Sequence, residues 1–222
     1  MALIVYGSGL SPFVRKVCVA LGEKGLPYTL EQINPFNPTP DFVAMSPLKR
    51  IPAFRDTDLP EPNTLADSTV ICDYLEHKFP MPALYPSDPY LRARALWFEE
   101  YADSVVATCI GRGLFFERVV KKMIRQVTDE NVCQKALKED LPPLFDYLEK
   151  ELGANDYMVG NVFSIADISI ATMLVNFDHV GEKIDSARWP RLNAYQARLF
   201  ARPTFKMLME QERPLVERFR AA

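Results

Sequence analysis

The chain has 222 residues and a formal net charge of −3, with 48% hydrophobic and 25% charged residues. This composition is typical of a folded protein, and the length suits one large domain or two small ones. The slight acidic excess argues against a nucleic-acid-binding surface, which would be basic. No run approaches the ~20 apolar residues of a membrane span, so we expect no membrane association.

The N-terminus and the cysteines favour a cytoplasmic protein. The first seven residues lack the basic region and the long apolar region of a signal peptide. The four cysteines stand far apart in the sequence, at Cys18, Cys72, Cys109 and Cys133. Such spacing predicts neither a zinc site nor a disulfide framework. We therefore expect free thiols, no bound metal and a reducing compartment.

Proline divides the chain into two unlike parts. Of 18 prolines, 13 lie between Pro12 and Pro89 and only 5 in the remaining 133 residues. Because proline breaks helix interiors, the first ninety residues cannot be mainly helical, whereas the rest can. Four prolines mark residues 80–89 as a semi-rigid linker. We expect one domain over residues 1–79 and a second over residues 90–222.

The first part alternates between short strands and helices. Apolar runs and turn residues predict strands at 3–6, 28–33, 51–54 and 64–65. Helical spacing and helix-start residues predict helices from 12 to Gly25, around 41–45, and from 68 to 79. The first two strands, joined by a helix, would form a parallel βαβ unit.

Beyond residue 89 the apolar spacing is helical. It predicts one long helix over 90–123 and a helix pair, or a kinked helix, over 130–152 that is interrupted at Pro142-Pro143. Three more helices are predicted at 163–175, 190–200 and 204–212. Ser164 and Asp167 have the spacing of a capping box, which we interpret as structural.

Three local patterns could hold a ligand. Ser11, before Pro12, would cap a helix and place its hydroxyl where a helix favours an anion, a thiolate included. Ile51-Pro52 is either an ordinary proline at a strand edge or a cis peptide that presents backbone to a ligand. Asp67-Ser68 is either a helix cap or a site for an amine and a carboxylate. Local sequence leaves each alternative open.

The order of these patterns resembles a cytosolic glutathione S-transferase of the serine type, over almost the whole chain. The matching segments are Ser11-Pro12-Phe13 through Lys16-Val17, Arg50 to Phe54, Leu65 to Ser68 with Ile71 and Tyr74-Leu75, and Phe163 to Ile168. The resemblance implies an α/β, thioredoxin-like N-terminal domain that binds glutathione. It also implies an all-α, helical-bundle C-terminal domain that supplies a pocket for the electrophile.

The resemblance also assigns roles to residues. Ser11 would be catalytic and would donate a hydrogen bond to the glutathione sulfur; Tyr6, at the end of the first strand, is the alternative. A free thiol has a pKa of about 8.5, and lowering it by ~2 units requires ~2.7 kcal/mol of thiolate stabilisation. One charge-assisted hydrogen bond and a helix N-terminus together are of that size.

The glutathione-binding residues implied in this way are Ile51 and Pro52 for the cysteinyl amide, Asp67 for the γ-glutamyl amine, Ser68 for its carboxylate, and Lys49 or Arg50 for the glycyl carboxylate. Asp67 stands where glutamate is more usual in the family, so it reaches one methylene less far. The electrophile pocket would be lined by Leu10, Cys109, Arg112 and Phe116.

We therefore expect a homodimeric, cytoplasmic detoxification enzyme that uses glutathione as co-substrate to conjugate small hydrophobic electrophiles. The alternatives are a glutathione-dependent peroxidase, dehalogenase or isomerase that uses the same thiolate. The third hypothesis is a non-catalytic member of the family that binds glutathione.

Overall fold

The computed structural model of the protein describes residues 2–220. The chain divides into two compact units, residues 1–85 and 86–222, each described by itself below. The expected linker over 80–89 stays a prediction. Within the described residues, no helix combines the length and the apolar character needed to cross a bilayer.

The N-terminal unit is built on a mixed sheet of four strands in the order β2-β1-β3-β4. The strands are β1 (Leu3–Gly7), β2 (Thr29–Gln32), β3 (Ala53–Asp56) and β4 (Thr64–Ala66). β2 runs parallel to β1, β3 antiparallel to β1, and β4 antiparallel to β3. The helices are α1 (Pro12–Glu23), α2 (Pro40–Met45) and α3 (Ser68–Lys78). The predicted βαβ unit and the thioredoxin-like fold class are confirmed.

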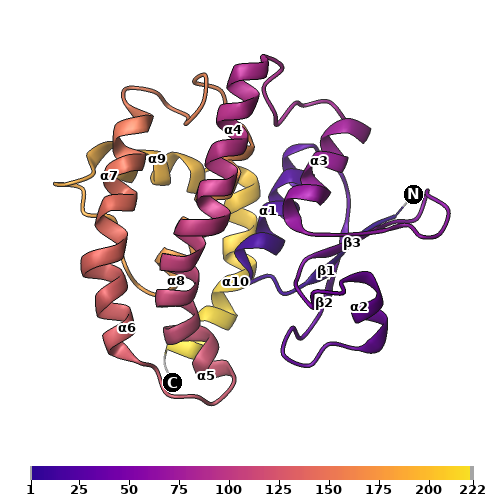
Figure 1. The fold of residues 1–222 in the computed structure, drawn as a ribbon, viewed down its shortest axis with the longest axis horizontal. Helices are drawn as coiled ribbons and strands as arrows, with labels where there is room; N and C mark the ends of the chain where they lie inside the picture. The colour runs from indigo at the N-terminus through magenta and orange to yellow at the C-terminus, as the bar shows by residue number, and fades with distance from the viewer. Residues whose placement is uncertain (1, 221–222) are drawn as a thin grey trace. The chain divides into compact units, whose positions relative to one another are not determined.

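Alternation along β1 builds a core on each face of the sheet. Figure 1 shows α1 and α3 on one side of the sheet and α2 on the other. Leu3 and Val5 are buried, and alternation along the strand places their side chains on the face opposite to that of Tyr6. Tyr6 packs against Phe42 of α2 and Ala53 of β3. The two helical layers therefore depend on the register of one central strand.

Of the two interpretations of Ile51-Pro52, the one that places Pro52 in a strand at the sheet edge does not hold. β3 starts at Ala53 and lies between β1 and β4. Pro52 is therefore outside the ladder, and its missing N–H removes no hydrogen bond from it. The other interpretation holds, because the Ile51–Pro52 peptide bond is cis.

A buried ion pair fixes the end of the N-terminal unit. Lys24 Nζ lies 2.7 Å from Glu76 Oε2 and donates to the carbonyls of Phe79 (2.8 Å) and Pro82 (2.9 Å). The Glu76 carboxylate in turn accepts hydrogen bonds from the backbone N–H groups of residues 84–85. This one ion pair thus provides hydrogen-bond partners for four main-chain groups and holds the proline-rich segment against α1 and α3.

The second unit is all helical (Figure 1). Its first long helix joins α4 (Pro89–Tyr101), the π-helical η1 (Ala102–Val120) and α5 (Lys121–Met123) without a break. The second joins α6 (Glu130–Lys135), the π-helical η2 (Ala136–Asp140) and α7 (Leu141–Leu152). Three helices follow, namely α8 (Ile165–His179), α9 (Pro190–Phe200) and α10 (Pro203–Arg220). The helical C-terminal domain is confirmed.

The expected interruption at Pro142-Pro143 does not occur. The helix continues through both prolines, which stand in the first turn of α7. The π-helical turns of η2 directly precede them, so the carbonyls left without a proline N–H lie where the i→i−4 pattern is already interrupted. Proline here marks a change of helix type instead of a helix end.

α8 is the core of the second unit, because every residue in it except Asp178 is buried. The predicted capping box at its start is confirmed, with Asp167 Oδ2 accepting from Ser164 N at 2.8 Å. Asp167 Oδ1 also accepts from Met158 N and from the Tyr195 hydroxyl, each at 2.8 Å. Burial raises the pKa of Asp167 to about 6, although these hydrogen bonds oppose the shift.

Replacing Glu76 by alanine should lower the free energy of unfolding by about 3 kcal/mol, because it leaves the Lys24 charge buried and unpaired. The measurement is urea unfolding followed by circular dichroism. His77→Ala is the matched control, since this neighbour on α3 is exposed and should change stability by about 0.5 kcal/mol or less. Equal losses in the two variants would contradict the assigned role.

Asp167→Asn should destabilise the second unit by about 3 kcal/mol. The carboxylate of Asp167 accepts hydrogen bonds from buried donors. In the variant, the NH₂ group of asparagine cannot accept from these donors and would be placed against one of them. Asp129→Asn, at the exposed N-cap of α6, is the control and should be nearly neutral, because asparagine caps helices well. Thermal unfolding of both variants tests this; a neutral Asp167→Asn would refute it.

Candidate functional site

The three predicted glutathione-binding segments lie at one edge of the sheet. Ser11 follows the end of β1, Ile51-Pro52 precede β3, and Asp67-Ser68 follow β4. Because β3 is antiparallel to both of its neighbours, the end of β1, the start of β3 and the end of β4 coincide. The register shows this directly, since Ala53 pairs with Tyr6 on one side and with Ala66 on the other.

Close packing at Gly7 brings these segments together. A Cβ on Gly7 would lie 2.4 Å from Val14 Cγ2 and 3.4 Å from Ile51 Cβ, so only glycine fits there. The Asp67 N–H donates to the Pro52 carbonyl at 3.4 Å. The first turn of α1, the cis peptide and the start of α3 are therefore in contact through the main chain of β1 and β3.

Ser11 is the N-cap of α1, and its Oγ accepts a hydrogen bond from Val14 N at 3.4 Å. Pro12 takes the first helical position, as the sequence predicts. The cap uses the hydroxyl only as an acceptor. Within residues 2–220 the structure shows no group that receives the Ser11 hydroxyl proton, and the side chain is only half-buried. Capping and hydrogen-bond donation to a ligand are therefore compatible.

Asp67 caps α3 in a left-handed backbone conformation, with φ of 84°. Its Oδ1 accepts from Thr69 N at 2.9 Å and Val70 N at 3.3 Å. In the described part of the chain its Oδ2 takes part in no hydrogen bond, and the residue is exposed. Ser68, by contrast, is buried. Asp67 thus caps the helix with one oxygen and leaves the other for a cation.

Lys49 and Arg50 occupy the loop before the cis peptide, and both are exposed. Lys49 has a φ of 55°, and Arg50 exchanges two hydrogen bonds with the buried Ser46 hydroxyl, at 2.7 and 3.2 Å. The geometry favours neither as the ligand for the glycyl carboxylate.

Tyr6 is buried on the α2 face of the sheet, with the Arg55 guanidinium 5.9 Å from its ring centroid. Burial raises the pKa of its phenol, with Arg55 opposing and Glu31 adding to the shift. α1 covers the other face. Gly7, the residue after Tyr6 in β1, packs against Val14 of α1, whereas Tyr6 does not face that helix.

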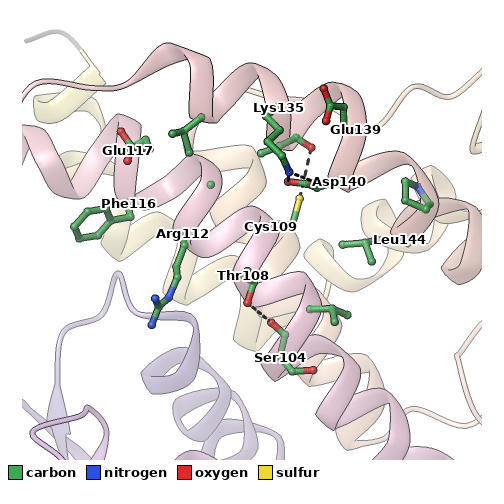
Figure 2. Close-up of a pocket in the computed structure, with 15 residues that line it drawn as sticks. Ser104, Thr108, Cys109, Arg112, Phe116, Glu117, Lys135, Glu139, Asp140 and Leu144 are labelled. Carbon is green, nitrogen blue, oxygen red and sulfur yellow. Dashed lines mark hydrogen bonds and ion pairs between the residues drawn. The ribbon is translucent and has the colours of Figure 1, made fainter.

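The second unit holds a cavity of about 1050 Å³ between its two long helices (Figure 2). Cys109, Arg112 and Phe116, which the sequence places in the electrophile pocket, all line it. Leu10, the fourth predicted residue, is buried in the N-terminal unit beside Ser11. The remaining lining residues are Ser104, Val105, Thr108, Gly113, Glu117, Val132, Lys135, Ala136, Glu139, Asp140, Pro143 and Leu144.

Sequence reasoning missed the second wall of this cavity, which comes from residues 132–144. The one local signal for it is Gly113 in the long helix, where a Cβ would lie 2.8 Å from the Ala136 Cβ. Glycine at this position lets η1 and η2 approach. Lys135 Nζ pairs with Asp140 Oδ1 at 2.7 Å, and Figure 2 shows Cys109 directed from η1 toward this pair.

Cysteine chemistry contributes little to the site. All four cysteines are buried, and none of them forms a disulfide bond. Burial raises the pKa of Cys109 to about 12, with Asp140 adding to the shift and Lys135 opposing it, and its Sγ lies 3.7 Å from the Ala136 carbonyl oxygen. Among the described residues, no group of three or more His, Cys, Asp or Glu side chains could hold a metal.

Comparison with known proteins identifies the family to which this fold belongs. Residues 5–83 match the family model of the glutathione S-transferase N-terminal domain, and residues 125–198 match that of the C-terminal domain. The chain is 28% identical to a glutathione S-transferase of Hyoscyamus muticus, over 95% of this chain and 99% of that protein. It is also 28% identical to a stringent starvation protein A homolog of Haemophilus ducreyi, over 87% and 83% of the two chains.

A solved structure supports the same fold. The crystal structure of a glutathione S-transferase from Rhodospirillum rubrum superposes with a TM-score of 0.84 at 27% identity, and the match covers 93% of this chain and 91% of that one.

The raised pKa makes Cys109 a poor nucleophile although it lines a cavity, since about one thiol in ten thousand is ionised at pH 8. Iodoacetamide at pH 8 should leave Cys109 unmodified in the native protein and alkylate it in concentrated urea. Peptide mass spectrometry measures the modified fraction. Complete alkylation of Cys109 in the native protein, at the rate seen in urea, would contradict the assignment.

Proposed function

This chain belongs to the glutathione S-transferase family, and we propose that it joins the thiolate of glutathione to small, largely apolar electrophiles. The observation that carries the proposal is the meeting of Ser11, Ile51-Pro52 and Asp67-Ser68 at one edge of the sheet. In the reaction, the thiol loses its proton to solvent and the sulfur then bonds to the electrophilic carbon. In a substitution, the leaving group departs with the electron pair of the broken bond.

Ser11 stabilises the thiolate in this proposal. Its hydroxyl proton has no acceptor within residues 2–220, and it stands at the N-terminus of α1, where backbone N–H groups face outward. A hydrogen bond to a charged acceptor contributes about 1.5–3 kcal/mol, and a helix N-terminus about 0.3–1 kcal/mol more. Together they account for a thiol pKa lowered by ~2 units, which requires ~2.7 kcal/mol.

The γ-glutamyl end of glutathione is assigned to the start of α3. The Oδ2 of Asp67 accepts from the ammonium group, and Ser68 binds the carboxylate through its hydroxyl and its backbone N–H, because Asp67 Oδ1 already accepts from the N–H groups of Thr69 and Val70. The main chain of Ile51 lies outside the β-ladder, which begins at Ala53, so it can pair with the cysteinyl amide. Lys49 or Arg50 binds the glycyl carboxylate.

The electrophile binds in the cavity of the second unit in this proposal. A volume of about 1050 Å³ accommodates a drug-sized molecule, and its lining combines apolar and polar side chains. We also propose that the protein is a cytoplasmic homodimer that acts in detoxification, as the family resemblance implies.

Two alternatives use the same site. A peroxidase, dehalogenase or isomerase would need the same thiolate, and a panel of electrophiles, peroxides and isomerisable substrates separates these activities. The second alternative is a non-catalytic role in binding glutathione. It is considered because one relative is named a stringent starvation protein and not a transferase. Retention on immobilised glutathione with no turnover of any substrate would favour it.

Ser11→Ala should reduce kcat/KM with chlorodinitrobenzene by about 10- to 100-fold at pH 6.5, because the thiol pKa of bound glutathione returns toward 8.5. Ultraviolet absorbance of the bound thiolate, titrated with pH, measures that pKa directly. Tyr6→Phe is the matched control and should keep both the pKa and the rate within about twofold. The reverse pattern would assign the role to Tyr6.

A further inference from the structure

Most charged side chains that line the cavity of the second unit are paired within the protein. On the second wall, Lys135 Nζ lies 2.7 Å from Asp140 Oδ1 and 2.9 Å from its Oδ2. On the first wall, Glu117 pairs with Lys121 at 2.6 Å and accepts a hydrogen bond from Asp129 N at 2.8 Å. The charges of Lys135, Asp140 and Glu117 are therefore compensated by contacts that need no ligand.

Arg112 lines the same cavity without such compensation. Within residues 2–220 the structure shows no ion pair and no hydrogen bond of its side chain, which is exposed. An arginine stays charged at every physiological pH and presents its N–H donors as a planar fork. That fork matches the two oxygens of a carboxylate. The first wall thus offers a cation that is available to an acidic ligand.

The second wall repels such a ligand. The hydrogen bond to Asp140 raises the pKa of Lys135, and the charge of Glu139 adds to the shift. Glu139 also lines the cavity and is exposed, so two carboxylates accompany one ammonium group there. Figure 2 shows Arg112 on the side of η1 that faces away from this group. An anion in the cavity is therefore drawn to the first wall alone, and this fixes its orientation.

An aromatic side chain lies next to the available cation. Phe116 stands four residues after Arg112 in η1, about one helical turn, and lines the same cavity. Figure 2 shows both side chains directed to the same side of the helix. Aromatic rings pack favourably on one another in offset or edge-to-face arrangements. A ligand ring packed on Phe116 would place an attached carboxylate within reach of the guanidinium.

We propose that Arg112 gives this enzyme a preference for aromatic electrophiles that carry a carboxylate. The carboxylate binds the guanidinium, the ring packs on Phe116, and the opposite side of the ring carries the reacting carbon. The glutathione thiol loses its proton to solvent, its sulfur bonds to that carbon, and a halide leaves with the electron pair of the broken bond. This inference rests on the proposed function and deepens it, because it names the class of the second substrate.

The test compares two substrates of nearly equal shape, 4-chloro-3,5-dinitrobenzoate and 4-chloro-3,5-dinitrobenzamide. At pH 6.5 the carboxyl group is ionised and the amide is neutral. Each kcat/KM is divided by the rate constant of the uncatalysed reaction with glutathione, which removes the difference in intrinsic reactivity. The wild-type protein should favour the benzoate. Arg112→Met should lower the benzoate-to-benzamide ratio about tenfold, which corresponds to ~1.4 kcal/mol.

Two further variants and one change of conditions serve as controls. Arg112→Lys keeps the charge but loses the planar fork, so it should restore part of the ratio. Lys138→Met removes an exposed positive charge of the same unit at a residue that does not line the cavity; it should leave the ratio within about twofold. Added salt should lower the wild-type ratio, because the Arg112 charge is exposed and therefore screened. This last readout needs no variant.

An unchanged ratio in Arg112→Met would overturn the proposal, since a general disturbance of the cavity lowers both rates and leaves their ratio as it was. A wild-type ratio that salt does not alter would also overturn it. If the wild-type protein conjugates neither compound, the proposed transferase function is refuted instead. Calorimetry with the unreactive 3,5-dinitrobenzoate and 3,5-dinitrobenzamide then decides the inference, and a preference that does not depend on Arg112 would overturn it.

Discussion

The antiparallel placement of β3 between β1 and β4 is the constraint on which the proposed glutathione site depends. It brings together three chain segments that are separated by tens of residues, namely the start of α1, the cis peptide at Ile51–Pro52 and the start of α3. The strands supply only the scaffold, since each candidate residue lies just outside the ladder. Backbone groups and helix N-termini that the ladder does not use are thereby left for a ligand at one edge.

Within this scaffold the residues proposed to bind glutathione also stabilise the fold. Ser11 and Asp67 cap helices with one acceptor each, and each retains a further hydrogen-bonding function. Two buried lysines add contacts to α3 and to the segment that follows it. Lys16 contacts Thr69 in the first turn of α3. Lys24 pairs with Glu76 of α3 and donates to carbonyls of the segment after that helix. A buried charge that is well paired contributes little net stability, yet its loss is costly, so such contacts favour one arrangement over others.

The second unit is organised around a buried helix and a cavity. α8 is buried along nearly its whole length and depends on Asp167 to satisfy donors from three segments. The first long helix is π-helical along the part that lines the cavity, whereas the second is π-helical only over its central segment η2. Wider helical turns expose side chains at irregular angles, which a regular α-helical pattern cannot predict. The sequence located one wall of the cavity, at Cys109 and Phe116, and missed the other, because no local pattern specifies which distant helix faces the first wall.

Local chemistry was enough to predict the helix starts at Ser11, Asp67 and Ser164, the strands, and the contrast between the two units, because caps, apolar periodicity and proline act over a few residues. The sequence, through its resemblance to the family, predicted which residues would bind glutathione, and local patterns left Ser11, Ile51-Pro52 and Asp67-Ser68 each with a structural alternative. Only the tertiary structure decided that β3 is central, that the helix continues through Pro142, and that Lys16 reaches Thr69. Strand order and buried contacts join residues far apart in the chain, and no local pattern specifies which distant partner each residue meets.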